Sequence, residues 1–500
     1  MEVSVGKSIT KRSEDYSKWY QEVIANAELV DSSPVRGCMV FRPNGFAIWE
    51  NMKSDLDRRF KETGHVNAYF PLLIPQSFLS KEAEHVEGFA KECALVTHHR
   101  LRTVVGKDGR PKVEPDPAAK LEEALVIRPT SETIIWHMYG KWINSYRDLP
   151  LLINQWANVM RWEMRTRPFL RTAEFLWQEG HTAHASKEEA EEETIRMLNV
   201  YRDFCVETLA VPVVTGVKTA TERFAGAEDT YTIEAMMQNG WALQSGTSHF
   251  LGQNFAKAFD VTYQDSNGEQ VHVWATSWGV STRLIGALIM THSDDTGLVL
   301  PPKVAPTQIV LVPIWRKEEE KEAVLDFAYQ TLKSLKTAGF RVQIDSRENM
   351  KPGAKYYEWE RKGVPLRMEI GPRDVQNGSV FCARRTGGKK FGLKVDEHFI
   401  SSTQTALAEI QQELLDKALS LRESKTYEVS NYKEFCGRVK KGGFFLVPWC
   451  DDAENEDKVK DETKATIRCY PLDKQQDIEG KVCFYSGRPA THIALFARAY

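Results

Sequence analysis

Residues 161–181 of this chain are RWEMRTRPFLRTAEFLWQEGH, a stretch that combines arginines, carboxylates and aromatic rings at short spacing. Residues 159–163 predict a strand, the arginine-rich centre predicts a loop, and residues 175–185 predict a second strand. Alternate residues of a strand share a face, so Arg161 and Glu163 should point in one direction. Three side chains of the second strand should also point together: Phe175, Trp177 and Glu179.

A sheet face that presents a guanidinium, a carboxylate and aromatic rings suits a nucleoside triphosphate. Arginines bind phosphate oxygens through two parallel hydrogen bonds while an aromatic ring stacks on the base. The loop adds three arginines that would overhang this face: Arg165, Arg167 and Arg171. Taken alone, the stretch is equally compatible with a surface hairpin that carries exposed ion pairs.

A second stretch, SWGVSTRLIG at residues 277–286, places Arg283 after a turn of small residues. The apolar residues 284–290 that follow predict a buried helix. An arginine at the start of such a helix needs a partner, because an unpaired buried charge is very costly. A phosphate is one possible partner, and a carboxylate elsewhere in the fold is the alternative.

The composition is that of a globular protein. Hydrophobic residues make up 42% of the chain and charged residues 27%, which is too apolar for a disordered chain. At roughly 150 residues per domain, the length predicts about three domains. The formal charge of −3 excludes a highly cationic coat for nucleic acid but leaves room for a basic groove on one domain.

Signals of membrane insertion and secretion are lacking in the sequence. No apolar run approaches the roughly 18 residues of a membrane span, and residues 1–20 contain no apolar stretch typical of a signal peptide. The eight cysteines are dispersed and form no disulfide framework, which favours a reducing compartment. We therefore expect a cytoplasmic protein without a membrane partner.

The pattern of elements changes near residues 300–303, where the sequence is LPPK. A strand at 308–312, a helix at 317–338 and a strand at 341–345 then predict a compact α/β domain with a partly parallel sheet. A third region begins near residue 402 with a long helix.

Two local expectations concern the first 100 or so residues. Apolar residues at helical spacing predict a helix over residues 46–60, which Asn44 would cap and Gly64 would end. The polar residues 98–120, which glycine and proline interrupt, predict a mobile surface loop.

Together these motifs resemble an enzyme family. Three segments resemble, in order, motifs 1, 2 and 3 of the class II aminoacyl-tRNA synthetases: residues 64–71, 161–175 and 279–283. Three more are similar to the prolyl-tRNA synthetases of the eukaryotic and archaeal type: RPTSE at 128–132, FLWQEGH at 175–181 and QSGTSHFLGQ at 244–253. The resemblance extends from about residue 13 to the last residue, and three motifs in the right order make it specific.

The resemblance implies an α/β fold class of the α+β kind. It implies a catalytic domain with an antiparallel sheet at residues 1–300 and an α/β anticodon-binding domain at 301–400. A small α+β domain at 401–500 resembles a zinc-binding domain. Because motif 1 usually forms the subunit interface in the family, it also implies a homodimer.

The implied function is that of a proline–tRNA ligase. L-Proline and ATP give prolyl-adenylate and pyrophosphate, and the prolyl group is then transferred to the 3′ end of tRNA(Pro). The catalytic residues would be Arg161, which bridges the proline carboxylate and the α-phosphate, and Arg283, which binds the distal phosphates with Arg171. Mg²⁺ would accompany ATP and bridge its phosphates.

The resemblance also assigns residues to each substrate. The implied ATP-binding set is Arg161, Glu163, Arg171, Thr172, Phe175, Gln244, Thr247, Ser281 and Arg283. The implied proline-binding set is Phe89, Thr130, Glu132, Arg161, Trp177 and His249. A carboxylate for the ammonium and flat walls for the ring fit proline physically. Plain core packing is the alternative for each aromatic residue, and a helix-start carboxylate is the alternative for Glu132.

In the anticodon-binding domain, basic side chains near strand ends would contact tRNA: Arg347, Lys355 and Arg367. A solvated basic face is the alternative. In the last domain, many relatives hold zinc with four cysteines; here Cys450, Cys469 and Cys483 occur in the corresponding region, and their expected close partners are missing. We therefore expect no metal site there, since a closed zinc site needs four nitrogen or sulfur ligands.

Two other functions are alternatives to this interpretation. A sister synthetase, for threonine, would need a Cys/His/His metal set in the pocket, which the sequence lacks. A catalytically inactive synthetase-like protein that serves in RNA binding or assembly would have lost Arg161, Glu163 or Arg283, and all three are present.

Overall fold

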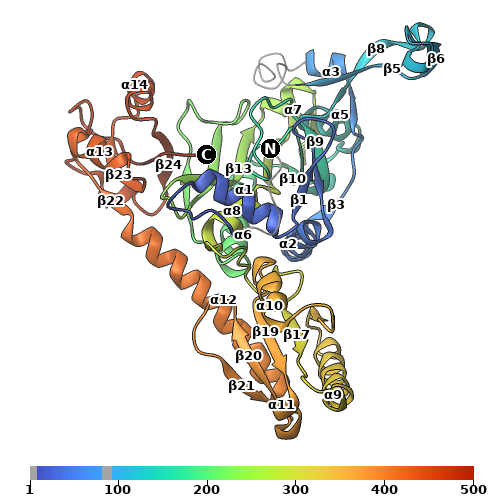
Figure 1. Cartoon of the computed structure of the whole chain (residues 1–500). Helices are drawn as coiled ribbons and strands as arrows, with labels where there is room; N and C mark the ends of the chain where they lie inside the picture. Colours follow the sequence, from blue (N-terminus) through green and yellow to red (C-terminus); the bar gives the residue numbers. More distant parts are fainter. Residues whose placement is uncertain (1–7, 81–92) are drawn as a thin grey trace.

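The computed structural model describes residues 8–80 and 93–500 of the chain. A large sheet runs through the upper part of the molecule, and a smaller α/β unit extends below it (Figure 1). Nowhere in the described residues is there a helix long and apolar enough to cross a membrane.

The large sheet has eleven strands in the order β22-β23-β25-β24-β11-β12-β13-β16-β10-β9-β3. Its catalytic part is antiparallel from β11 to β9, and only β3 pairs with β9 in parallel. The bounds are β11 (Val213–Val217), β12 (Asp229–Met236), β13 (Ala242–Gly252), β16 (Trp274–Ser281), β10 (Glu174–His184), β9 (Leu151–Met160) and β3 (Val66–Asn67). This arrangement confirms the predicted antiparallel catalytic sheet.

Helices cover one face of this sheet and form the main core with it. They are α1 (Tyr16–Asn26), α2 (Pro43–Glu62), α6 (Lys187–Glu207) and α8 (Arg283–His292). Leu284 to His292 of α8 are all buried, as the apolar pattern predicted. Ser186 caps α6 by accepting a hydrogen bond from the Glu189 amide (3.2 Å).

The predicted helix around residues 46–60 exists, but its predicted cap is wrong. Helix α2 begins at Pro43 with Arg42 in the capping position, and no side chain caps it. The Asn44 side chain instead donates to the Ala27 carbonyl (2.8 Å). Proline at the first position has no amide hydrogen to be capped, which removes one need for such a residue. Gly64, just beyond the helix, has a φ of +90°, as a residue that ends a helix often does.

The predicted loop at residues 98–120 is also wrong. This segment contains a hairpin of two strands, β6 (Leu101–Val105) and β7 (Pro111–Pro115). The hairpin continues an arm (Figure 1) whose strands are β4 (Leu73–Pro75), β5 (Ala94–His98) and β8 (Lys120–Ile127). Ion pairs across the hairpin join Arg100 to Asp116 (2.8 Å) and Arg102 to Glu114 (2.6 Å). The glycines are confined to the turn, and the cross-strand charges that support the pairing are invisible to a local pattern.

The first strand of the motif 2 stretch ends earlier than predicted. Strand β9 stops at Met160, so Arg161 and Glu163 lie in the loop and not on a strand face. The Arg161 amide still donates to the Ala173 carbonyl (2.8 Å), which holds the loop at the end of the strand pair.

The α/β unit has a sheet in the order β18-β17-β19-β20-β21. Strands β17 (Ile309–Pro313), β18 (Val342–Ile344) and β19 (Leu366–Ile370) are parallel, while β20 (Ser379–Arg384) and β21 (Phe391–Lys394) are antiparallel. Its helices are α9 (Glu318–Thr337), α10 (Pro352–Arg361), α11 (Pro372–Asn377) and the start of α12 (Phe399–Ser424). The predicted partly parallel sheet is confirmed.

The last region returns to the large sheet. Helix α12 leads from the α/β unit to it (Figure 1), followed by β22 (Thr426–Glu428), α13 (Tyr432–Val439), β23 (Phe444–Trp449), α14 (Ala453–Thr463), β24 (Thr466–Pro471) and β25 (His492–Ala497). Strand β24 pairs with β11, so the C-terminal strands extend the catalytic sheet. The other elements are β1 (Val30–Ser32), β2 (Met39–Phe41), α3 (Gln76–Ser80), α5 (Glu132–Trp142), α7 (Asn254–Ala258), β14 (Thr262–Gln264) and β15 (Gln270–His272).

One glycine of the catalytic sheet is required by its neighbour. Gly180 on β10 lies opposite Trp278 on β16, and a Cβ atom there would come within 2.1 Å of the Trp278 ring. That ring is buried against Phe60, with 5.1 Å between ring centroids. We therefore expect Gly180→Ala to destabilise the protein by about 1–3 kcal/mol through overpacking, seen as a lower melting temperature.

Gly353→Ala on α10 is the matched control, because a Cβ atom there would meet no other described part of the chain within 4 Å beyond its own helix. Alanine favours a helix over glycine, so this variant should melt at the same or a slightly higher temperature. Equal melting temperatures for the two variants would contradict the packing argument.

Candidate active site

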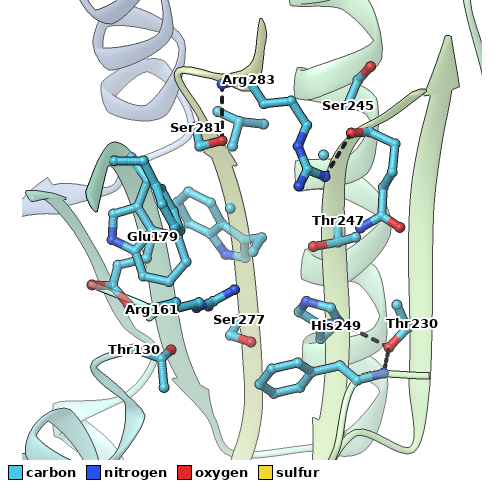
Figure 2. Close-up of a pocket in the computed structure, with 18 of the residues that line it drawn as sticks. Thr130, Arg161, Glu179, Thr230, Ser245, Thr247, His249, Ser277, Ser281 and Arg283 are labelled. Carbon is cyan, nitrogen blue, oxygen red and sulfur yellow. Dashed lines mark hydrogen bonds between the residues drawn. The ribbon is translucent and has the colours of Figure 1, made fainter. Parts of the chain in front are cut away.

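A cavity of about 420 Å³ opens on the face of the catalytic sheet opposite the main helices. Strands β10, β16 and β13 form its floor, and the loop after β9 and the start of α8 close its sides (Figure 2). Thirteen of the residues predicted to bind ATP or proline line it: Thr130, Glu132, Arg161, Glu163, Arg171, Thr172, Phe175, Trp177, Gln244, Thr247, His249, Ser281 and Arg283. Phe89, the remaining one, lies outside the described residues.

Arg161 extends into the cavity from the motif 2 loop (Figure 2). Its Nε donates to the Pro129 carbonyl (3.0 Å), and its guanidinium lies 5.6 Å from the ring centroids of both Phe175 and Trp177. As predicted, these two rings project from the same face of β10. The arginine is thus held against a wall of aromatic rings, with its charge in the cavity.

Arg283 enters the same cavity from the first turn of α8 (Figure 2). Its Nε donates to the Leu170 carbonyl (3.3 Å) and its Nη1 to the Gln244 carbonyl (3.4 Å). Burial, together with the nearby charge of Arg161, lowers the pKa of Arg283 to about 10. The group stays cationic at neutral pH, and among the described residues it forms no ion pair with a carboxylate.

Other polar residues of the motif 2 loop are already engaged with one another. Glu163 pairs with Arg171 (2.8 Å), whose side chain is largely exposed. Thr172 donates to the Glu174 carbonyl (2.7 Å). Arg171 can therefore turn toward a phosphate at the cavity mouth by exchanging one anionic partner for another.

The other end of the cavity is rich in carboxylates. Thr130 donates to Glu132, and Glu179 accepts hydrogen bonds from Ser131 and Gln155 (both 2.6 Å). Burial acts to raise the pKa of Glu179, but the hydrogen bond from His181 (3.1 Å) and these two hold it below its ordinary value. This end therefore carries negative charge that suits a cation.

The pKa values of the two histidines of this end are shifted in opposite directions. Burial acts to lower the pKa of His181, yet its hydrogen bond to Glu179 and the charge of Glu132 raise it. His249 is also buried, and burial together with His181 lowers its pKa to about 3. His249 is thus neutral at physiological pH, hydrogen-bonded to Thr230 (3.0 Å) and packed on the Phe224 ring (4.6 Å between centroids).

Several cavity residues received no role from the sequence: Glu179, His181, Lys218, Glu222, Phe224, Thr230, Ser245 and Ser277. The predicted alternation along β10 placed Glu179 on the face of Trp177 but assigned it no substrate, and the same alternation could have indicated His181. The loop between β11 and β12 that supplies Lys218 to Phe224 has no periodicity that marks it.

The predicted anticodon residues lie in different surroundings from those expected. Lys355 is buried and donates to the Asp345 carbonyl (3.0 Å), and Arg367 is nearly buried between Glu360 (2.8 Å) and Glu369 (3.2 Å). Neither side chain faces solvent, and both lie against acidic neighbours: Lys355 against Asp345, and Arg367 against Glu360 and Glu369.

Arg347 is the exposed member of that set. It pairs with Asp345 (2.7 Å) and with Glu358 (3.0 Å), while 41% of its side chain is exposed. Of the three predicted residues it alone is placed to reach a phosphate in solvent.

The three cysteines in the region that corresponds to the zinc site of relatives are divided between two apolar clusters. Cys450 and Cys483 contribute to one and Cys469 to the other. Cys450 Sγ lies 3.4 Å from Ser486 Oγ. Within residues 8–80 and 93–500, no three His, Cys, Asp or Glu side chains are grouped to hold a metal ion.

The Glu179–His181 pair gives a testable pH dependence. The contribution of His181 to the stability of the fold is complete below the pKa of a histidine in the unfolded chain, about 6.5. It is lost as the pH rises through the raised pKa that His181 has in the folded protein. The contribution of Glu179 is present above the pKa of a glutamate in the unfolded chain, about 4.3. It is lost as the pH falls through the lowered pKa that Glu179 has in the folded protein. We expect Glu179→Gln to lower the melting temperature more at about pH 6 than at about pH 9. An equal decrease at both pH values would contradict this charge assignment.

Three family models match the chain in consecutive segments. The model of the class II tRNA synthetase core domain (G, H, P, S and T) matches residues 112–292, and an anticodon-binding domain matches residues 308–399. The model of the C-terminal domain of prolyl-tRNA synthetase matches residues 432–500. The match to the core domain includes every cavity residue in the predicted ATP-binding set.

Full-length relatives agree with these models. The chain is 59% identical over 494 residues to a proline–tRNA ligase of Porphyromonas gingivalis, covering 99% of each chain. It is 58% identical over 498 residues to one of Bacteroides fragilis, again covering 99% of each, and 56% identical over 497 residues to one of Flavobacterium johnsoniae, covering 99% of this chain and 100% of the other. The consecutive domain matches and the identity along nearly the whole length show that the chain belongs to the prolyl-tRNA synthetase family.

Proposed function

We propose that the cavity on the catalytic sheet is where this chain carries out the ligase reaction of its family. In that reaction, L-proline and ATP give prolyl-adenylate and pyrophosphate, and the prolyl group is then transferred to tRNA(Pro). The observation that carries the proposal is that Arg161 and Arg283, far apart in sequence, line one cavity with carboxylates at its other end.

The chemistry explains why the site is rich in arginine. The attacking proline carboxylate is already an anion, so adenylate formation needs no general base. It needs the two reactants held in line and the charge on the phosphates neutralised. Arg161 would bind both the carboxylate and the α-phosphate and thereby hold nucleophile and electrophile together.

The remaining ATP contacts follow from position in the cavity. The Phe175 ring would stack on adenine, Arg171 and Arg283 would bind the distal phosphates, and three residues would hydrogen-bond the nucleotide: Gln244, Thr247 and Ser281. Glu163 and Thr172 would support the motif 2 loop. Mg²⁺ would enter with ATP, because phosphate oxygens and water supply the ligands that it prefers.

Proline would occupy the carboxylate end. Thr130 and Glu132 would accept hydrogen bonds from its NH₂⁺ group, and Trp177, His249 and Phe89 would form the walls around its ring. A neutral His249 fits this role, since a cationic one would repel the ammonium. Because the ring is recognised by shape, discrimination against smaller amino acids should be limited to about 1–3 kcal/mol per methylene.

The proposal extends to the rest of the chain. Residues 1–300 would form the catalytic domain, 301–400 the anticodon-binding domain and 401–500 the C-terminal domain, in agreement with the segments that the family models match. The motif 1 resemblance supports a homodimer. A cytoplasmic location is supported by the cysteines, none of which forms a disulfide in the described chain.

Substitution of Arg161 tests the catalytic assignment. Arg161→Ala should reduce proline-dependent ATP–pyrophosphate exchange by about 100-fold or more, because about 3 kcal/mol of transition-state stabilisation is lost. Arg202→Ala on the surface of α6, where Arg202 pairs with Asp203, is the control and should exchange normally. Near-normal exchange in Arg161→Ala would reject the assignment. An inactive RNA-binding protein would show no exchange in the wild type.

Charge reversal of Arg347 tests the tRNA assignment. Arg347→Glu should raise the KM for tRNA in aminoacylation and leave adenylate formation unchanged, since the residue would contact only tRNA. Lys333→Glu, an exposed position on α9, is the charge-matched control. Equal losses of exchange and aminoacylation in Arg347→Glu would contradict a role confined to tRNA binding.

A further inference from the structure

The loop between β11 and β12 separates the cavity from the C-terminal region. It contributes Lys218, Glu222 and Phe224 to the cavity wall. Its other side contacts α14, and strand β11, which leads into it, pairs with β24; both α14 and β24 belong to the segment that matches the C-terminal family model. The position of this wall therefore depends on side chains of a region that is remote in sequence.

Three charged side chains are buried together behind this wall. Lys218 Nζ lies 3.0 Å from Glu234 Oε1, and Arg468 binds the same carboxylate through Nε to Oε2 (3.1 Å) and Nη2 to Oε1 (3.3 Å). The exposed fractions of these side chains are 2%, 0% and 10%. Burial acts to raise the pKa of Glu234, but Arg468 and Lys218 hold it below its ordinary value, so it is an anion.

This cluster affects the phosphate end of the cavity. Lys218, the member of the cluster at the cavity wall, lines the same cavity as Arg283. The charge of Glu234 acts to raise the pKa of Arg283 and that of Arg468 acts to lower it. Two cations, Lys218 and Arg468, thus share one buried anion, Glu234. The excess positive charge is open to the cavity through Lys218 and Arg283, where an anionic ligand would compensate it.

A second contact fixes the same loop. Glu456 on α14 accepts hydrogen bonds from Thr219 (3.2 Å) and Thr221 (2.8 Å). The C-terminal region thus holds the loop at two adjacent points. Glu456 binds Thr219 and Thr221 directly, and Arg468 acts on Lys218 through Glu234.

We propose that Arg468 is a positioning residue for ATP: it fixes Glu234, which in turn holds Lys218 at the cavity wall. This rests on the proposed function of the cavity. Neither Glu234 nor Arg468 is among the described residues that line the cavity. Arg468 would therefore act on the substrate only through its neighbours. The C-terminal region would then contribute to nucleotide binding without contacting the nucleotide.

The direct test measures ATP binding and exchange in Arg468→Gln. We expect the Kd for ATP by calorimetry, and the KM for ATP in exchange, to rise about tenfold, because Glu234 and Lys218 lose their fixed geometry. The KM for proline should change by less than about twofold. Arg488→Gln is the matched control, since Arg488 lies in the same region, is not among the described residues that line the cavity, and has a half-exposed side chain that pairs with Asp452 and donates to Cys450 Sγ (3.3 Å).

A conservative variant separates positioning from folding. Arg468→Lys keeps the buried charge but reaches one carboxylate oxygen in place of two, so its Kd for ATP should lie between those of the wild type and Arg468→Gln. If the glutamine variant does not fold, the lysine variant alone tests the role of Arg468. We then expect Arg468→Lys to have a raised Kd for ATP and an unchanged KM for proline.

The inference is overturned if Arg468→Lys binds ATP as the wild type does, or if the KM values for ATP and proline rise together. Because ATP binding is measured without proline, its result does not depend on catalysis. A wild type that binds ATP but lacks proline-dependent exchange would reject the proposed function and leave the role of Arg468 to be decided by the Kd values.

Discussion

The charge on the buried Arg283 guanidinium is the constraint on which the cavity depends. Within the described chain its hydrogen bonds go to the Leu170 and Gln244 carbonyls, and these dipoles compensate a full charge only in part. Glu234 adds compensation at longer range. The remaining positive charge makes the phosphate end of the cavity complementary to a polyphosphate, while packing of α8 fixes where that charge lies.

The opposite end of the same cavity has the opposite charge. Glu132 and Glu179 lie there, and burial keeps His249 neutral, so a cationic amino group meets carboxylates and no repulsion from His249. Proline has its ammonium and carboxylate on the same carbon. A cavity that is negative at one end and positive toward Arg161 would therefore orient the substrate before reaction, and such orientation lowers the barrier when no acid or base is needed.

Local patterns predicted well what depends on neighbours in sequence. The common face of Phe175 and Trp177, the buried α8 and the strand–helix–strand order after residue 303 follow from periodicity, and the structure has them. The hairpin within residues 98–120 and the inward-facing Lys355 and Arg367 were missed. Their conformations depend on partner charges that a pattern along the chain does not associate with them.

The sequence by itself determined the elements with a clear periodicity, the chemical types of the site residues and, through the resemblance of its motifs, the family. The tertiary structure decided which charges meet. The cavity brings Arg161 and Arg283 together, and the sheet joins β24 to β11 so that Arg468 reaches Glu234. Such contacts depend on strand pairing between segments more than 200 residues apart. No local propensity encodes that pairing, because its free energy comes from burial and charge compensation that exist only in the folded chain.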